Sequence, residues 1–185
     1  MVRLGVAGAA LLAVGGGLAS WITAGYGALL GPEDVPVALS IKEMAVVRAL
    51  VEGLFPAEDG FPAGLAIGLH QRVDEELWAA SDFTRGALKD GIQLLEHVPP
   101  LYGHAHRFTA LAPAARVEVF SRMLASDNAM LRQIAFALKQ MTHLFYYASP
   151  ATWPHIHYDG PFVETPKPPA SAVLYADLVR ARRPT

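Results

Sequence analysis

Two pairs of histidines have the residue type and spacing to bind a metal ion. The segment SPATWPHIHYDGPF (149–162) contains His155 and His157, and a second pair, His104 and His106, lies earlier in the chain. Side chains at positions i and i+2 of an extended backbone can share a metal, so four histidines could complete a tetrahedral site. Neither pair has a zinc-motif spacing such as HExxH. A metal- or haem-binding envelope protein that uses both pairs is therefore the alternative interpretation.

Other cofactor and catalytic sites find little support in the sequence. The chain has no cysteine, which excludes disulfides, thiolate-held iron–sulfur clusters and covalently attached haem c on this chain. Haem b between His143 and a methionine or second histidine is conceivable, but a buried, hydrogen-bonded histidine is the simpler interpretation. There is no GxSxG elbow, GxxxxGK[ST] loop or GxGxxG turn after a strand. We predict no catalytic residue, no metal and no cofactor on this chain.

The segment at 149–162 also has the composition of a protein-binding loop. Its prolines restrict the backbone, Trp153 and Tyr158 offer large rigid surfaces, and Asp159-Gly160 is typical of a turn. We therefore predict that the loop binds a partner protein through Trp153, His155, His157, Tyr158, Asp159, Pro161 and Phe162.

An apolar segment near the N-terminus, residues 4–30, contains no charged residue. A helix needs about 20 apolar residues to cross a bilayer, whereas a secretory signal core has roughly 7–15, so the length favours a retained membrane helix over a cleaved signal. Arg3 precedes the segment and Glu33 follows it, which predicts a single pass through the inner membrane with the rest of the chain in the periplasm. Trp21 and Tyr26 fit an aromatic belt at the far interface.

After this segment the sequence predicts an all-α domain. Ser40-Ile41-Lys42-Glu43 is a capping box, and apolar residues then recur at helical spacing until Pro56. A bundle of about five helices is expected because sustained strand-like alternation is absent. The four further helices are predicted from Pro62, from Ser81 or Asp82 to about Glu96, from Pro113 to about Ala125, and from the Ser126-Asp127-Asn128 cap to about Tyr147.

The charged residues of this domain suggest solvated surface rather than chemistry. Three neighbouring acids, Asp74, Glu75 and Glu76, could indicate acid–base catalysis but are more typical of a solvated helix face. The formal net charge is −2, and no basic cluster points to nucleic acid or anionic lipid as a partner.

The C-terminal residues, 163–185, are predicted to form a tail. Its proline-rich start (164–169) should be extended, and a short amphipathic stretch, 172–180, follows. Such a tail is most simply ordered by lying on another chain, with packing on its own bundle as the alternative. The predicted organisation is thus a membrane helix (1–30), a linker (31–39), a helical domain (40–162) and this tail.

Three blocks of sequence, in this order, resemble one protein family. ALVEGLFPAEDGFPAG (49–64), FTALAPAARVEVFSRM (108–123) and QMTHLFYYASPATWPHIHYDGPF (140–162) are similar to the small subunit, subunit 3, of gluconate 2-dehydrogenase. The resemblance covers roughly residues 40–162. It rests on the helix ending in Leu54-Phe55-Pro56, the helix start Leu111-x-Pro113-x-x-Arg116, and the block from Tyr146-Tyr147 to Tyr158-Asp159-Gly160-Pro161.

The resemblance implies a role inside a complex. In that family the small subunit accompanies a large FAD-dependent dehydrogenase of the glucose–methanol–choline type, often with a multihaem cytochrome c that passes electrons to quinone. The large subunit oxidises an alcohol or sugar, and the small one supports its folding, export and stability. Many such small subunits carry a twin-arginine signal, whereas this sequence has Arg3 alone before its apolar segment. We therefore expect a non-catalytic, permanently anchored subunit whose partners hold FAD and haem c.

Overall fold

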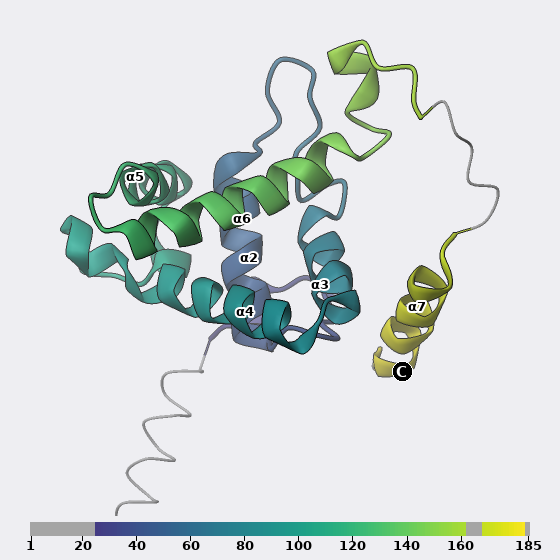
Figure 1. Cartoon of the computed structure of the whole chain (residues 1–185), viewed down its shortest axis with the longest axis horizontal. Coiled ribbons are helices and arrows are strands. Elements are labelled where there is room, and N and C mark those ends of the chain that lie inside the picture. The colour runs from purple at the N-terminus through teal and green to yellow at the C-terminus, as the bar shows by residue number, and fades with distance from the viewer. Residues whose placement is uncertain (1–24, 162–167, 184–185) are drawn as a thin grey trace, which may run out of the picture.

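The computed structural model describes residues 25–161 and 168–183, and the regular structure in these residues is helical (Figure 1). Short 3-10 turns connect the α-helices: η1 (Gly27–Leu29), η2 (Pro99–Tyr102), η3 (Phe108–Ala110) and η4 (Trp153–Ile156). The predicted all-α fold is confirmed. The described residues contain six α-helices: α2 (Ile41–Leu54), α3 (Leu69–Ala79), α4 (Asp82–His97), α5 (Pro113–Leu124), α6 (Ala129–Tyr147) and α7 (Ala170–Arg182).

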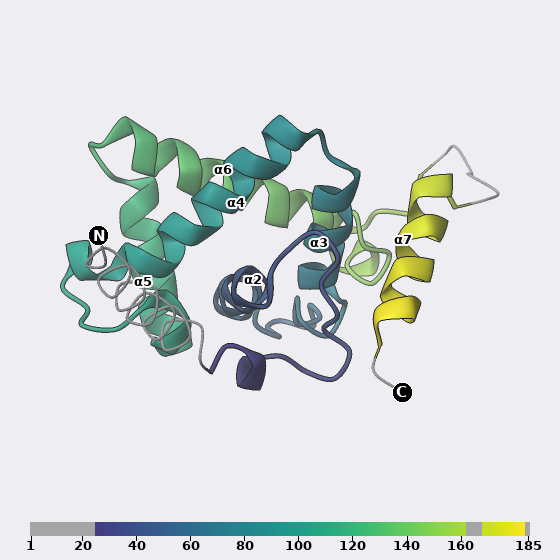
Figure 2. The same cartoon turned by 90° about the horizontal axis from the view of Figure 1, so that it is seen from below.

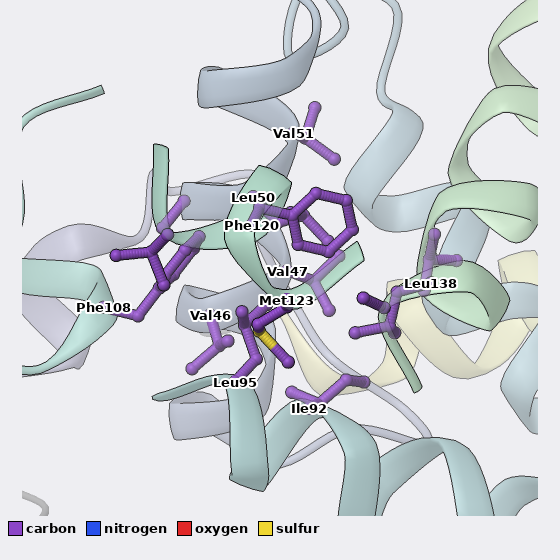
Figure 3. Packing of buried hydrophobic residues seen from close by; sticks show 14 of the residues in the cluster. Val46, Val47, Leu50, Val51, Ile92, Leu95, Phe108, Phe120, Met123 and Leu138 are labelled. Carbon is purple, nitrogen blue, oxygen red and sulfur yellow. The ribbon is translucent and has the colours of Figure 1, made fainter. Parts of the chain in front are cut away.

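Helix α2 is the centre of the bundle. Its predicted capping box forms, because Ser40 Oγ accepts a hydrogen bond from the Glu43 amide (3.2 Å) and the Glu43 carboxylate accepts one from the Ser40 amide (2.7 Å). Residues 44–47 are consecutive and each is at most 1% exposed, so α2 is buried on all sides rather than along one stripe. Around it pack α3, α4, α5 and the turns η1 and η3. Figure 3 shows the core that results, with side chains from α2, α4, α5 and α6 interdigitating.

The predicted start of the second helix, Pro62, is wrong. Helix α3 begins only at Leu69, after a turn in which the Gly64 amide donates to the Phe55 carbonyl (2.8 Å). A Cβ at Gly64 would lie 2.8 Å from Val51 Cγ1, so a glycine is needed where this turn sits against α2. Gly68 precedes α3 with φ +70°, a left-handed conformation that interrupts any helix begun earlier. The predicted starts near residues 81, 113 and 128 are confirmed.

The prediction of a solvated acidic face is wrong for Asp74, which is fully buried. Its carboxylate accepts hydrogen bonds from the amides of Val37 (2.7 Å), Ala38 (3.0 Å) and Leu39 (2.7 Å). It accepts a further one from the Tyr175 hydroxyl (2.7 Å). A single buried carboxylate therefore joins α3 to an N-terminal segment and to α7.

Residues 31–39, predicted as a linker, are consequently part of the folded unit. Besides the contacts with Asp74, the buried Asp34 carboxylate accepts hydrogen bonds from His70 Nε2 (2.6 Å) and Arg48 Nη1 (2.8 Å). These bonds fix the segment against α2 and α3. The physical reason is that its buried polar groups are paired within the chain, as buried polar groups must be.

The prediction that the C-terminal tail (163–185) lies on another chain is also wrong for the described part. Helix α7 forms there and packs on α3, with Tyr175 only 9% exposed. Burial and the Asp74 carboxylate raise the pKa of the Tyr175 hydroxyl. Arg182 Nη1 donates to the Pro36 carbonyl (3.0 Å), so α7 contacts two separate segments of its own bundle.

The predicted membrane helix (4–30) lies mostly outside the described residues, in 1–24. Within residues 25–161 and 168–183, no helix has both the length and the apolar character needed to cross a bilayer. Residues 25–30, the last of the predicted helix, do not form part of a membrane-spanning helix. They contain the turn η1 (Gly27–Leu29), which contacts α2, and Leu30 packs against the core.

Tyr26 corrects the prediction of an interfacial aromatic belt at this position. Its side chain is only 1% exposed, and its hydroxyl donates to the fully buried Glu96 carboxylate (2.7 Å). The Glu96 carboxylate also accepts a hydrogen bond from the Thr109 amide (3.0 Å). The Arg107 guanidinium lies over the Tyr26 ring, 4.2 Å from its centre. Burial and the adjacent carboxylate raise the pKa of Tyr26 to about 12.

We expect Tyr26→Phe to lower the free energy of unfolding by about 1–3 kcal/mol, because it removes one hydrogen bond from a buried carboxylate. The measurement is equilibrium unfolding in urea. The matched control is Tyr158→Phe, which alters a tyrosine that is 44% exposed and should leave the urea midpoint unchanged. Equal midpoints for Tyr26→Phe and the unmodified chain would contradict this role.

Candidate partner interface

A groove of about 610 Å³ runs between the C-terminal half of α6 and the segment that follows it. Because α6 carries its buried residues on the side facing the bundle, the lining residues of α6 project outward. Its lining is mainly apolar and aromatic. The helix contributes Gln140, His143, Leu144, Tyr147 and Ala148, and the following segment contributes Trp153, Tyr158 and Pro161.

Trp153 and Tyr158, both predicted partner-binding residues, meet in this groove. Their rings pack edge to face with centres 5.2 Å apart. The indole Nε1 of Trp153 donates to the Tyr147 carbonyl (3.1 Å), which ties the loop to the end of α6. Gly160, with φ +103°, lies against the indole, where a Cβ would come within 3.1 Å of it. Trp153, Tyr158 and Pro161 are thus brought together on one rigid surface.

The other predicted site residues are placed differently. His155 does not line the groove; its ring centre lies 4.9 Å from that of Phe61, in the loop after α2. His157 is exposed and ends η4 in a left-handed conformation (φ +52°), and Asp159 is exposed beside it. Phe162 lies outside the described residues. Of the predicted residues that the structure describes, Trp153, Tyr158 and Pro161 therefore line the groove, whereas the two histidines and Asp159 do not.

A second hollow, of about 230 Å³, adjoins the groove. His143 and Tyr147 line both, so one surface extends from the loop after α2 to η4. Tyr146 of α6 fixes the loop after α2. Its hydroxyl donates a hydrogen bond to the Pro62 carbonyl (2.7 Å), and its ring stacks on that of Phe55 with centres 4.5 Å apart. Figure 1 shows this loop and η4 at the same end of the bundle.

Two large apolar residues of this surface were missed by the sequence analysis. Leu144 is 65% exposed and Tyr147 is 44% exposed, although each belongs to a well-packed helix. A signal was present, since Phe136, Leu144 and Tyr147 recur at helical spacing on the face of α6 opposite its buried one. We call Leu144, Tyr147, Trp153 and Tyr158 the α6–η4 face. A contiguous exposed apolar patch of this kind is characteristic of a protein-binding surface.

The family of the chain follows from a match to known sequences. The model of the family described as gluconate 2-dehydrogenase subunit 3 matches residues 41–160, well over half of the chain. This chain belongs to the gluconate 2-dehydrogenase subunit 3 family. The matched range runs from α2 through η4 and includes the whole α6–η4 face, whereas η1 and α7 lie outside it. Comparison with curated proteins and with solved structures found no match.

The two histidine pairs of this subunit 3 chain do not converge. The segment with His104 and His106 joins η2 to η3, near α4 and α5, and the segment with His155 and His157 follows α6. Figures 1 and 2 place these segments at opposite ends of the bundle. Among the described residues, no group of three or more His, Cys, Asp or Glu side chains could hold a metal ion. The four-histidine site is therefore not formed by this part of the chain.

His143, considered above as a haem ligand, contacts its own helix and the core residue Phe55. Its Nδ1 lies 2.9 Å from the Lys139 carbonyl, and its ring packs edge to face on Phe55 at 4.9 Å. Burial lowers the pKa of His143 below its ordinary value of 6.5, although the hydrogen bond to Lys139 acts in the opposite direction. His143 is thus favoured in its neutral form in the folded state.

This lowered pKa predicts that stability falls as the solution is acidified. An unfolded chain takes up a proton near pH 6.5 before the folded one does. The contribution of His143 is therefore complete above pH 6.5 and is lost as the pH falls towards the folded pKa. Burial and the Lys42 ammonium lower the pKa of His97 in the same direction.

The measurement is the urea midpoint between pH 7.5 and 5, where His143→Gln should flatten the profile. Replacing His97 as well should flatten it further. An unchanged slope in the double variant would show that other groups govern stability in this range.

Proposed function

We propose that this chain is a non-catalytic subunit that stabilises and helps to assemble a flavin-dependent dehydrogenase, holding the large subunit through the α6–η4 face. The family to which it belongs is named as a subunit of the gluconate 2-dehydrogenase complex. The observation that carries the proposal is the exposure of Leu144 and Tyr147 beside a fixed aromatic loop, inside the region that matches the family. The substrate would be oxidised in the partner, which supplies the FAD.

The α6–η4 face has the physical properties of an interface centre. Aromatic side chains are enriched among the residues that contribute most to the binding free energy of protein interfaces. Binding is tighter when such side chains are already held in their bound conformation. Trp153 is held by its bond to the Tyr147 carbonyl and by its contact with Gly160. Trp153 would therefore lose little conformational freedom on binding.

The apolar N-terminal segment extends this proposal to the membrane. Residues 4–24 are free of charge and long enough for one pass, at 1.5 Å per residue, through a hydrocarbon core of about 30 Å. The helical domain would then lie on the periplasmic side of the inner membrane. The complex would be kept close to the quinone and cytochrome c carriers that accept its electrons.

Affinity purification of the tagged full-length chain from native membranes in a mild detergent tests the proposal. We expect a flavoprotein to co-purify, recognised by its FAD absorbance, and the chain expressed alone to show no flavin spectrum. Purification without any flavoprotein would contradict it. A stoichiometric metal on the isolated chain, lost in the His155→Ala and His157→Ala double variant, would instead favour the metal-binding alternative.

A further inference from the structure

Tyr26 fixes the point at which the N-terminal segment leaves the bundle. Its buried side chain is held by Glu96 and covered by Arg107, and the next turn, η1, packs on α2. Gly25 precedes it with φ +97° and lies close to Arg107, where a Cβ would be 3.8 Å from Nη2. The uncharged residues 4–24 therefore end within one residue of a fixed position. No linker separates them from the folded domain.

The surface around this exit point is suited to a lipid interface. Leu29 is 40% exposed on η1, and Ile41 is 55% exposed in the first turn of α2. Lys42 follows Ile41 in the sequence, with its Nζ 2.9 Å from His97, and the Arg107 guanidinium lies over the ring of Tyr26. Apolar side chains interspersed with basic ones are typical of surfaces that rest among lipid headgroups.

The α6–η4 face lies at the other end of α2. This helix has 14 residues, so its two ends are about 20 Å apart. Its last turn leads directly into Phe55 and Phe61, which contact Tyr146 and His155. Figure 1 shows the loop after α2 and η4 at the top of the bundle, and Figure 2, seen from below, shows η1 beside α2 on the near side.

We propose that the end of the bundle formed by Tyr26, Leu29, Ile41 and Arg107 rests on the membrane surface, with the α6–η4 face turned away from the bilayer. We call it the membrane-facing end. The inference rests on the anchor in the proposed function and adds an orientation to it. Because the exit point is rigid, the domain has a fixed side towards the lipid. The large subunit is then bound on the side remote from the membrane.

The absence of cysteine from the sequence makes this orientation measurable. Single variants Leu29→Cys and Ile41→Cys label the membrane-facing end, and Ala57→Cys labels the exposed loop beyond the other end of α2. Each full-length variant carries an environment-sensitive fluorophore and is reconstituted into phosphatidylcholine vesicles that contain headgroup-labelled quencher lipids. We expect positions 29 and 41 to lose most of their fluorescence. Position 57 should lose little, because it lies about 20 Å farther from the lipid.

Carbonate extraction of the same vesicles separates the two ways of failing. If the chain is extracted, the anchor in the proposed function is wrong and the orientation falls with it. If it stays in the membrane but position 57 is quenched as strongly as positions 29 and 41, or none of them is quenched, only the orientation is overturned. Retention together with selective quenching at positions 29 and 41 supports both.

Discussion

Asp74→Ala is expected to lower the free energy of unfolding by about 3–5 kcal/mol, the largest loss we predict for a single side chain. The substitution deprives the amides of Val37, Ala38 and Leu39 of their acceptor at one time. It also removes the partner of the Tyr175 hydroxyl, which attaches α7 to α3. Urea unfolding monitored by circular dichroism measures the change in midpoint.

Two variants calibrate this result. Tyr175→Phe removes one of the four hydrogen bonds to Asp74 and should cost about 1 kcal/mol. Glu75→Ala removes the neighbouring acid, whose partner Arg72 is half exposed, and should cost less than about 1 kcal/mol. If Asp74→Ala is no less stable than Glu75→Ala, Asp74 does not make the large contribution to stability that its hydrogen bonds imply.

Leu144→Asp is expected to weaken assembly with the large subunit by about 100-fold, or 2–3 kcal/mol. It places a charge at the centre of the α6–η4 face, where burial without a partner is costly. Because Leu144 is 65% exposed in the isolated chain, stability should change by no more than about 0.5 kcal/mol. Titration calorimetry with the purified large subunit measures the affinity, and unfolding in urea measures the stability.

The matched control is Phe136→Asp, on the same side of α6 but outside the groove. Phe136 is 56% exposed, so the two substitutions are similar in chemistry and in burial. We expect the Phe136 variant to bind normally. Trp153→Ala and Tyr158→Ala test the loop half of the face, and both should also weaken assembly. Equal affinities for Leu144→Asp and Phe136→Asp would exclude this face as the binding site.

Much of the helical framework was predictable because its signals are local. Ser40, Ser81 and Asn128 each accept a hydrogen bond from the first turn of the helix that follows, and Pro113 begins another. The residues that cap a helix lie within three or four positions of it, so sequence alone reveals them. The three blocks that resemble the family could be recognised for a similar reason, because their residues, order and spacing are features of the sequence itself.

The errors arose where distant residues decide the outcome. Nothing near Asp74 in the sequence shows that three amides more than 30 residues earlier bind its carboxylate. The burial of Tyr26 likewise depends on its hydrogen bond to Glu96, which is 70 residues away. Pro62 is a good local helix start, but the close contact of Gly64 with α2 favours a turn. Tertiary contacts override local preference in each case.

The candidate site was predicted in part. The aromatic loop was recognised from Trp153 and Tyr158, whereas its α6 half was overlooked because the buried face of that helix dominates its pattern. Hydrophobic residues on a second face are visible in the sequence, but only the packed structure distinguishes an exposed Leu144 from a core leucine. The histidine pairs suggested a shared metal site that does not form. The spacing within each pair does not show whether the two segments lie together in the fold.

Site-specific photocrosslinking detects whether the α6–η4 face touches the flavoprotein in the assembled complex. A benzophenone amino acid replaces Leu144 in one full-length chain and Glu118, a 56% exposed residue on α5, in another. Both chains are irradiated in native membranes. We expect a crosslinked product with the flavoprotein from position 144 and none from position 118. Crosslinking from position 118 alone, or no flavoprotein adduct from position 144, would contradict it.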